Sequence, residues 1–449
     1  MPGPSSPRYS VGTLVYTRAG LIALFGWLLW GDFIFNLMES VMPSLLPLTL
    51  KNYGASNREI AIIVSTIYMM VNSVMNPIIS YNSDRFRSRW GRRRPFIVAT
   101  TPLVVLFLCA IPFAPEILGF LTRADWMASL FALSPSAPII TMFAILVVGF
   151  QVFNMFISSV YYYLIPDVVP QELLGRFFGL FRIFGTTAGM VYNFFIFGHA
   201  DTHMREIFVG IAIIYGFFIL LMCWRVQEGE YPPPTAESHG HWWSGIQNYA
   251  KECFGHSYYW WVFLTYSCII WGNAATVFVV FFLRDEIGLS LDQIGTINAT
   301  GALAVIVTLI PLGWLLDRVG GHKMLIAGYL LQTISPLFFF VFVHGYWSAL
   351  VCCIFGAVPI AVTGLSASKW AVDVYPRARY GQFGSAGALF SSLGAMVLGP
   401  LCGIFIDTVH VYRFLYVWYA VFALIGAFSA MVVFRRWTAL GGPHNYQAP

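Results

Sequence analysis

The sequence predicts an all-α polytopic membrane protein with twelve transmembrane helices in two six-helix bundles. Three observations predict this fold class: composition, the length of the apolar segments, and an internal repeat. Of the 449 residues, 58% are hydrophobic and 10% are charged, whereas an ordinary soluble domain has roughly 25% charged residues. The apolar residues gather in segments of about 20, the length that crosses the hydrocarbon core of a bilayer as a helix.

The apolar segments lie six on each side of a polar stretch, residues 227–256, which we expect to be a central cytoplasmic loop. This loop separates an N-terminal bundle, 19–226, from a C-terminal bundle, 257–436, and leaves short cytoplasmic ends at 1–18 and 437–449. The predicted spans are 19–49, 58–82, 95–113, 139–165, 175–198, 206–226, 257–283, 290–316, 323–344, 347–371, 381–406 and 412–434.

Positive charge predicts the orientation. Nineteen of the 25 Lys and Arg residues fall on the side of the two termini, and short cytoplasmic loops carry the excess of Lys and Arg. We therefore expect both termini in the cytoplasm and an integral protein of the cell (inner) membrane. The first apolar segment is too long for a cleavable signal peptide, so it would serve as the targeting signal. The net charge of +5 then reflects topology and requires no nucleic-acid partner.

The sequence contains no pattern typical of an enzyme, a cofactor site or a metal site. The seven cysteines lie mostly in predicted spans without ligand spacing. His239 and His241 of the central loop have no further ligands beside them. Phosphate-binding loops and nucleophile motifs are absent from the sequence as well. We expect neither metal nor cofactor.

An internal repeat relates the two halves. The pattern D-V-x-P-x4-G occurs at 167–175, after the fourth span, and at 373–381, after the tenth. Asp-Arg pairs, each followed by a basic cluster, end the second and eighth spans. Two copies of a six-span unit in one orientation predict pseudo-two-fold symmetry, a substrate site between the halves, and transport by rocking one bundle against the other.

The acidic and basic residues of these loops are gating candidates. Acids at helix ends and clustered guanidinium groups form ion pairs that would hold the cytoplasmic ends together in one state. The alternative is that the charges only set topology. The candidates are Asp84, Arg85, Arg89, Arg92, Asp317 and Arg318.

A charge inside a span is a functional candidate, because it costs a few kcal/mol to insert. The first span carries Asp32 and Glu39, which share a narrow stripe with Asn36 and Pro43 at 100° per residue. This stripe would face a wet cavity, or the two acids would pair within the bundle. Further polar stripes follow in the fourth, fifth and seventh spans: Gln151, Asn154, Ser158 and Tyr162; Arg182, Thr186, Gly189 and Asn193; Asn273 and Thr276.

An acid, a guanidinium group and an aromatic ring are the groups that bind a sugar, through charge-assisted hydrogen bonds and contact with the C–H face. Asp32, Arg182 and Tyr162 supply them. For Arg182 the competing interpretation is snorkelling to the cytoplasmic surface. For Tyr162 it is membership of an aromatic belt at the helix end.

The segment 83–95, S-D-R-F-R-S-R-W-G-R-R-R-P, resembles the loop 2–3 signature of the glycoside-pentoside-hexuronide:cation symporters of the major facilitator superfamily. It looks closer still to the plant sucrose-proton symporters and to the melanosome-associated proton-sugar transporters of animals. This resemblance implies the major facilitator fold and proton- or cation-coupled transport of a sugar or glycoside.

The resemblance also implies roles for individual residues. Asp32 matches the sugar-binding aspartate of melibiose-type symporters, Arg182 their sugar-binding arginine, and Tyr162 an aromatic residue that is tryptophan there. Glu39 aligns with a glutamate of the melanosome-type proton-coupled relatives. The sodium-site acids fall on Asn72, Asn76 and Ser158, and a lysine of the eleventh span falls on Gln382. Without carboxylates, such a site should bind Na⁺ poorly.

The leading hypothesis is a proton-coupled sugar symporter that works by alternating access as a monomer in the bilayer, with H⁺ as coupling ion. Glu39 would carry the proton, and Asp32 is the second candidate for that role. One alternative is a proton antiporter that exports a sugar or another small solute. Another is a sugar-sensing receptor, which the short cytoplasmic segments disfavour. The expected substrate contacts are Asp32, Asn36, Asn154, Ser158, Tyr162, Arg182, Asn193 and Asn273.

Overall fold

The computed structural model describes residues 9–123, 129, 137–230, 249–376 and 379–449. The chain divides into two compact units. The N-terminal unit contains Met1–Ala55 and Met70–Thr235, and the C-terminal unit contains Ser56–Met69 and Ala236–Pro449. The beginning of the second predicted span is therefore grouped with the C-terminal unit.

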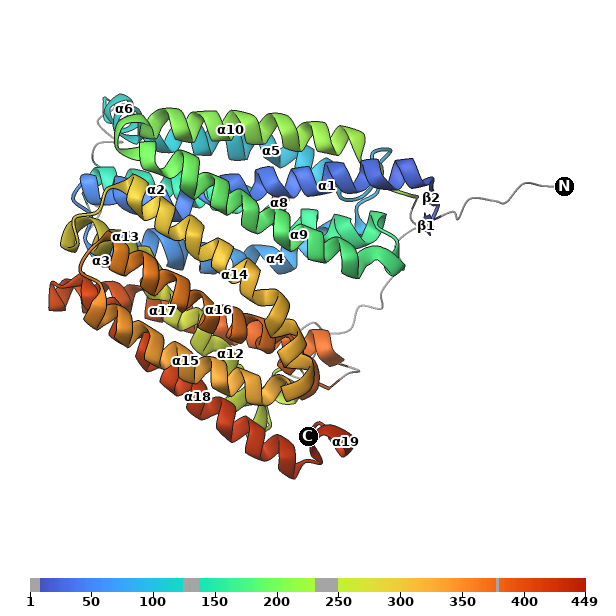
Figure 1. Cartoon of the computed structure of the whole chain (residues 1–449). Coiled ribbons are helices and arrows are strands. Elements are labelled where there is room, and N and C mark those ends of the chain that lie inside the picture. Colours follow the sequence, from blue (N-terminus) through green and yellow to red (C-terminus); the bar gives the residue numbers. More distant parts are fainter. Residues whose placement is uncertain (1–8, 124–128, 130–136, 231–248, 377–378) are drawn as a thin grey trace. The chain divides into compact units, whose positions relative to one another are not determined.

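Long helices run side by side in the N-terminal unit (Figure 1). Helix α1 packs against α9 and α10, and α5 packs against α8 and α10. The helices are α1 (Arg18–Glu39), α2 (Val41–Asn52), α4 (Ile67–Arg85), α5 (Arg94–Ala110), α6 (Ala114–Leu121), α8 (Pro138–Val168), α9 (Gln171–Val191) and α10 (Ala200–Arg225), with the short helical segments η2 (Ile111–Phe113), η3 (Tyr192–Ile196) and η4 (Phe197–His199).

A short β-hairpin precedes α1. Strands β1 (Tyr9–Val11) and β2 (Leu14–Tyr16) pair antiparallel, with Val11 opposite Leu14. The two-residue turn between them needs a left-handed residue, and Gly12 supplies it with φ of 54°. The hydroxyl of Thr13 accepts a hydrogen bond from the backbone N–H of Glu230 at 2.9 Å. This bond ties the hairpin to the chain beyond α10.

The C-terminal unit repeats the packing of the N-terminal unit. Helix α12 packs against α17 and α18, as α1 does against α9 and α10, and α15 packs against α16 and α18, as α5 does against α8 and α10. Its elements are α3 (Asn57–Ala61), η1 (Ile62–Thr66), α12 (Ser257–Gly272), η5 (Asn273–Phe278), α13 (Val279–Phe281), η6 (Phe282–Glu286), α14 (Leu291–Val319), α15 (Gly321–Phe342), α16 (Tyr346–Val374), α17 (Tyr380–Val409), η8 (Tyr412–Phe414), α18 (Leu415–Ala439) and α19 (Gly442–Asn445).

The predicted all-α polytopic fold class is confirmed. Ten helices in the described residues are long and apolar enough to cross a membrane, or 11 if the bent pair in α14 counts as one span. The longest, Gln171–Arg225, covers both the fifth and the sixth predicted spans. The short segments η3 and η4 connect α9 to α10 within this stretch, with no extended loop between the two helices. The backbone at His203, near the beginning of α10, is not helical.

Three details differ from the sequence-based prediction. The connection between the third and fourth predicted spans, 114–138, begins as helix α6. Pro115 lies in the first turn of α6, where its missing N–H costs nothing because the first N–H groups of a helix have no partner within the helix. The first span is broken at Ser40, between α1 and α2. Helix α14 bends by 48° next to Pro311, because proline removes one helical hydrogen bond and clashes with the preceding turn.

Candidate functional site

Asp32 of α1 is the most deeply buried predicted site residue, with 1% of its surface exposed. The side-chain amide of Asn36, one helical turn later, donates to its backbone carbonyl at 2.9 Å and to its carboxylate Oδ1 at 2.8 Å. The second carboxylate oxygen, Oδ2, has no hydrogen-bond partner among the described residues. A buried acceptor of this kind is costly unless a ligand or a proton satisfies it.

Helix α9 approaches this carboxylate through a glycine. A Cβ atom built on Gly185 would lie 3.2 Å from Asp32 Oδ2 and 3.0 Å from the Asn36 amide nitrogen. A larger residue would fill the space in front of the free oxygen. The sequence signal for this approach is the four-residue spacing of Gly185 and Gly189, because paired small residues let membrane helices pack closely. Gly185 did not figure among the sequence-based candidates.

Glu39 lies on the same helix and contacts α8. The side-chain amide of Asn154 donates a short hydrogen bond to Glu39 Oε1. The Asn154 amide oxygen and the Gln151 amide oxygen are buried without partners among the described residues. Glu39 and Asp32 are seven residues apart, so they are separated by about 10 Å along α1 at 1.5 Å per residue.

Tyr162 of α8 and Arg182 of α9 lie in the same unit as Asp32. Tyr162 is 48% exposed, and its ring meets Phe181 edge to face with centroids 5.5 Å apart. Arg182 is exposed on α9, one turn before Gly185. The acid, the guanidinium group and the aromatic ring therefore belong to helices α1, α9 and α8 of the N-terminal unit.

The other predicted contacts lie outside this group. Ser158 is partly buried, with its hydroxyl 3.8 Å from the Met155 sulfur. Asn193 lies in η3 and donates to the backbone carbonyl of Gly189 at 2.8 Å. Asn273 begins η5 in the C-terminal unit and is exposed.

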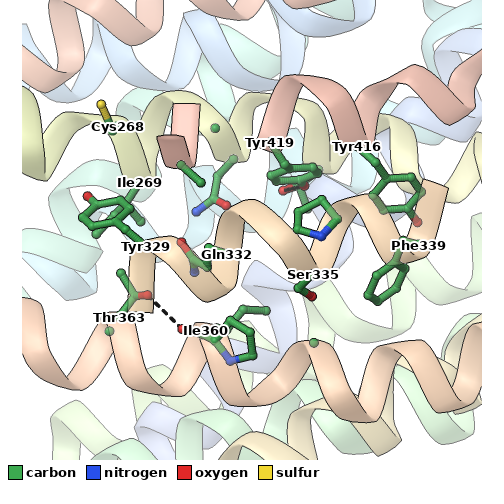
Figure 2. Close-up of a pocket in the computed structure, with 18 of the residues that line it drawn as sticks. Cys268, Ile269, Tyr329, Gln332, Ser335, Phe339, Ile360, Thr363, Tyr416 and Tyr419 are labelled. Atoms are coloured by element: carbon green, nitrogen blue, oxygen red, sulfur yellow. Dashed lines mark hydrogen bonds between the residues drawn. The ribbon is translucent and has the colours of Figure 1, made fainter. Parts of the chain in front are cut away.

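Asn273 lines a cavity of about 750 Å³ within the C-terminal unit. Figure 2 shows Gln332 and Ser335 of α15 projecting between the tyrosines of α18 and the facing residues of α16. Thr276 and Tyr419 share a hydrogen bond of 2.6 Å between their hydroxyl groups at this cavity. The sequence-based stripes had not indicated the contributions of α15 and α18. A few polar groups among apolar and aromatic walls are typical of a small-molecule site.

The predicted gating residues pair in ways that the sequence did not indicate. The Arg92 guanidinium group binds Asp167 with contacts of 2.7 and 3.1 Å, and Arg93 Nε contacts the same carboxylate at 3.2 Å. Asp167 is the acid of the D-V-x-P repeat. Arg85 and Arg89 are exposed, whereas the side chain of Asp84 lies outside the described residues.

In the C-terminal unit, the Asp317 carboxylate contacts Lys369 Nζ of α16 at 3.2 Å. The Arg318 guanidinium group lies 3.6 Å from the centroid of the Trp314 ring. The first pair links α14 to α16 of the same unit, and the second lies within α14 itself.

Asn76 is one of the residues that fall on the sodium-site acids of melibiose-type symporters, and its side chain is already hydrogen-bonded within the protein. The Asn76 amide oxygen accepts from the Ser159 hydroxyl at 3.0 Å and from the Tyr163 hydroxyl at 3.1 Å. An amide oxygen has two lone pairs, so both are used. Among the described residues, no three His, Cys, Asp or Glu side chains cluster as metal ligands.

The sequence-based hypothesis of a sugar symporter then predicts uptake that is unchanged when Na⁺ replaces K⁺ at constant pH. The amides and hydroxyl at Asn72, Asn76 and Ser158 offer too little negative charge to offset the dehydration of the ion. The measurement is initial uptake in proteoliposomes with NaCl or KCl at equal ionic strength. Uptake that rises with Na⁺ would contradict this prediction.

Solved structures share this fold at low sequence identity. A D-xylose-proton symporter matches with a TM-score of 0.66 and 13% identity over 92% of this chain and 97% of its own. The nucleoside transporter NupG matches with a TM-score of 0.66 and 14% identity over 92% and 99%. A bacterial homolog of the human lysosomal transporter Spinster, in an inward-facing and occupied conformation, matches with 0.67 and 12% over 97% and 100%.

A family model described as MFS/sugar transport protein matches residues 29–377, which is more than half of the chain. The match includes the second half of α1, which carries both acids, and all of α8 and α9, which carry the tyrosine and the arginine. The solved relatives are membrane transporters with the twelve-helix fold of the major facilitator superfamily. The chain is a multi-pass integral membrane protein and belongs to the MFS/sugar transport family.

Proposed function

We propose that this transporter is a proton-coupled sugar symporter that works by alternating access. Asp32, Arg182 and Tyr162 contact the sugar, and Glu39 carries the proton. The observation that carries the proposal is the Asp32 carboxylate, which is buried, held by Asn36 on one oxygen and without a partner among the described residues on the other.

The surroundings of Asp32 suit a sugar hydroxyl. Hydrogen bonds to an ionised acceptor are stronger than those between neutral groups. Gly185 has no side chain, so α9 packs against Asp32 without a Cβ atom in front of Oδ2. The half-exposed ring of Tyr162 offers an apolar face for the C–H surface of the sugar. The likeness to a D-xylose-proton symporter supports a sugar as the substrate class.

The surroundings of Glu39 suit a proton carrier. Its hydrogen-bond partner is the neutral amide of Asn154, and no Lys, Arg or His of the described residues forms an ion pair with it. A buried carboxylate without a cation is costly. A proton that neutralises it during part of the transport cycle removes that cost.

The remaining predicted features belong to the same proposal. Asn36, Asn154, Ser158, Asn193 and Asn273 serve as further substrate contacts, and the cavity at Asn273 supplies amides and hydroxyls over apolar walls. Both termini face the cytoplasm in the cell (inner) membrane. The loop charges at Asp84 and Asp317 and their neighbouring arginines hold the cytoplasmic gate.

The Arg182→Lys variant is expected to lose transport while it expresses and folds normally. Lysine keeps the charge but loses the planar fork that binds two sugar oxygens at once. The measurement is sugar uptake per mole of protein in proteoliposomes, with thermal stability as the check on folding. Normal transport by the lysine variant would favour snorkelling as the role of Arg182.

The test of the function itself has two stages. A thermal-shift screen of purified protein against a sugar panel identifies the substrate, because a ligand stabilises the folded state by mass action. Uptake of that sugar into proteoliposomes is then measured with an imposed pH gradient. Symport predicts accumulation when the outside is more acidic. Accumulation only when the inside is more acidic would instead favour the antiporter, and a panel without any stabilising sugar would contradict the substrate class.

A further inference from the structure

The second span is divided between the two units. It is a continuous apolar helix over Asn57–Ser80, but Ser56–Met69 is grouped with the C-terminal unit and the chain from Met70 with the N-terminal unit. Its first elements, α3 and η1, pack against α17 of the C-terminal unit. The hydrogen bonding of η1 is that of a π-helix, which is frequent at functional positions of helices. Movement of one unit against the other would therefore have to separate this span from α17 or bend it.

Asp407, near the end of α17, caps the beginning of the second span. Its Oδ1 accepts from the side-chain amide of Asn57 at 2.8 Å and from the backbone N–H of Asn57 at 3.2 Å. Its Oδ2 accepts from the backbone N–H of Arg58 at 3.1 Å. The first N–H groups of a helix have no partner within the helix, and the helix dipole favours a negative charge there. We call these three hydrogen bonds the Asp407 contact.

The position of Asp407 is unfavourable for its own helix. Asp407 lies in the last turn of α17, where the helix dipole disfavours an acid. The bonds to Asn57 and Arg58 offset this cost, because they place the same carboxylate at the positive end of another helix. The stability of α17 alone does not account for an acid at this position, whereas the contact with the second span does.

Helix α17 approaches the second span through two glycines that continue the four-residue spacing of Asp407. A Cβ atom built on Gly403 would lie 2.6 Å from the backbone oxygen of Asn57. A Cβ atom built on Gly399 would lie 3.8 Å from the Ser65 Cβ. Small residues at this spacing let membrane helices pack closely. One face of α17 therefore meets the second span along its first turns.

The chain that follows Asp407 is fixed within the C-terminal unit. The backbone N–H groups of Tyr412 and Arg413 donate to the Glu286 carboxylate. The Arg413 guanidinium group donates to two backbone carbonyls at the end of α15, at 2.8 Å each. The Asp407 contact is more accessible, because Arg58 is exposed. Water can replace such hydrogen bonds at a modest net cost, so this contact can open and form again.

We propose that the Asp407 contact keeps the transporter closed on the side opposite the two termini, which is the outer side in the proposed orientation. The contact is formed in this structure and is released when the second span separates from α17. The inference rests on the alternating access of the proposed function, but not on the sugar or on the coupling ion.

The first test measures how often the contact opens, and it needs no substrate. The reporter is Ala61→Cys, because Ala61 is 1% exposed and lies one turn after Asn57 on the same helix face. Asp407→Asn turns one of the two acceptor oxygens into an NH₂ group that can only donate. We expect maleimide to label the reporter about tenfold faster when Asp407→Asn is added, the factor that corresponds to one weakened hydrogen bond to a charged acceptor.

Two controls separate opening of the contact from general loosening. Asp285→Asn removes an exposed acid of the same unit and should leave the labelling rate of the reporter unchanged. The native Cys268 of α12 is 2% exposed, and its labelling rate should be the same with and without Asp407→Asn. Equal labelling of the reporter with and without Asp407→Asn, or an equal rise at Cys268, would overturn the proposal.

The second test asks whether transport requires the span to leave α17. The pair Ser65→Cys and Gly399→Cys suits a disulfide, since a Cβ spacing of 3.8 Å is the usual one. We expect oxidation of the pair to abolish uptake in proteoliposomes, a reductant to restore it, and each single cysteine variant to be unaffected by oxidant. Normal uptake by the crosslinked protein would overturn the proposal. If no sugar is transported by the parent, the proposed function fails, and the labelling test still decides whether Asp407 holds this contact closed.

Discussion

The Asp32→Asn variant is expected to bind sugar at least about tenfold more weakly than the parent, a loss on the order of 1–3 kcal/mol. Asparagine keeps the shape, and its oxygen still accepts from Asn36. The free acceptor Oδ2 becomes an NH₂ group that only donates. Helix α9 packs closely here, since a Cβ atom on Gly185 would lie 3.2 Å from Oδ2. The measurement is equilibrium sugar binding to purified protein by calorimetry.

The matched control is Asp292→Asn, which removes an exposed carboxylate in the first turn of α14. This variant should bind sugar like the parent, because Asp292 is an exposed residue of the C-terminal unit that belongs to none of the predicted polar stripes. Thermal stability of both variants separates a loss of binding from a loss of fold. An Asp32→Asn protein that is stable and binds sugar with parental affinity would remove Asp32 from the site.

The sequence placed Asp32 and Asn36 on one stripe of the first span, because that arrangement depends on a single helix. Asp32 and Asn36 are four residues apart, so the helical period alone brings the amide to the carboxylate, and the structure contains that bond. The lengths of the apolar segments predicted the all-α fold in the same way. The internal repeat in the loops predicted two similar halves, and the packing of α12, α15 and α18 repeats that of α1, α5 and α10.

The contacts between helices could not be predicted in this way. The helical period gives the face on which Glu39 lies, but not which residue of α8 faces it, so its bond to Asn154 appears only in the structure. The approach of Gly185 to Asp32 also depends on the rotation and offset of α9 against α1. The pairing of Arg92 with Asp167 joins residues 75 positions apart. Each contact depends on packing geometry, which one sequence does not specify.

The Glu39→Gln variant is expected to separate sugar binding from accumulation. Glutamine imitates the protonated acid, and its amide oxygen can still accept from Asn154. Sugar binding and sugar exchange across the membrane should therefore persist. Accumulation driven by a pH gradient should be lost, because no group at this position can release and take up the proton. The measurements are counterflow and pH-driven uptake in the same proteoliposomes.

The control is Glu206→Gln, which removes an exposed carboxylate on α10 and should leave both activities intact. A misfolded Glu39→Gln protein would lose both counterflow and pH-driven uptake. Loss of pH-driven uptake alone therefore identifies a defect in proton coupling. If this variant still accumulates sugar against a gradient, Glu39 does not carry the proton. Asp32 is then the next candidate, because it is the other acid on this face of α1 and one of its oxygens is free among the described residues.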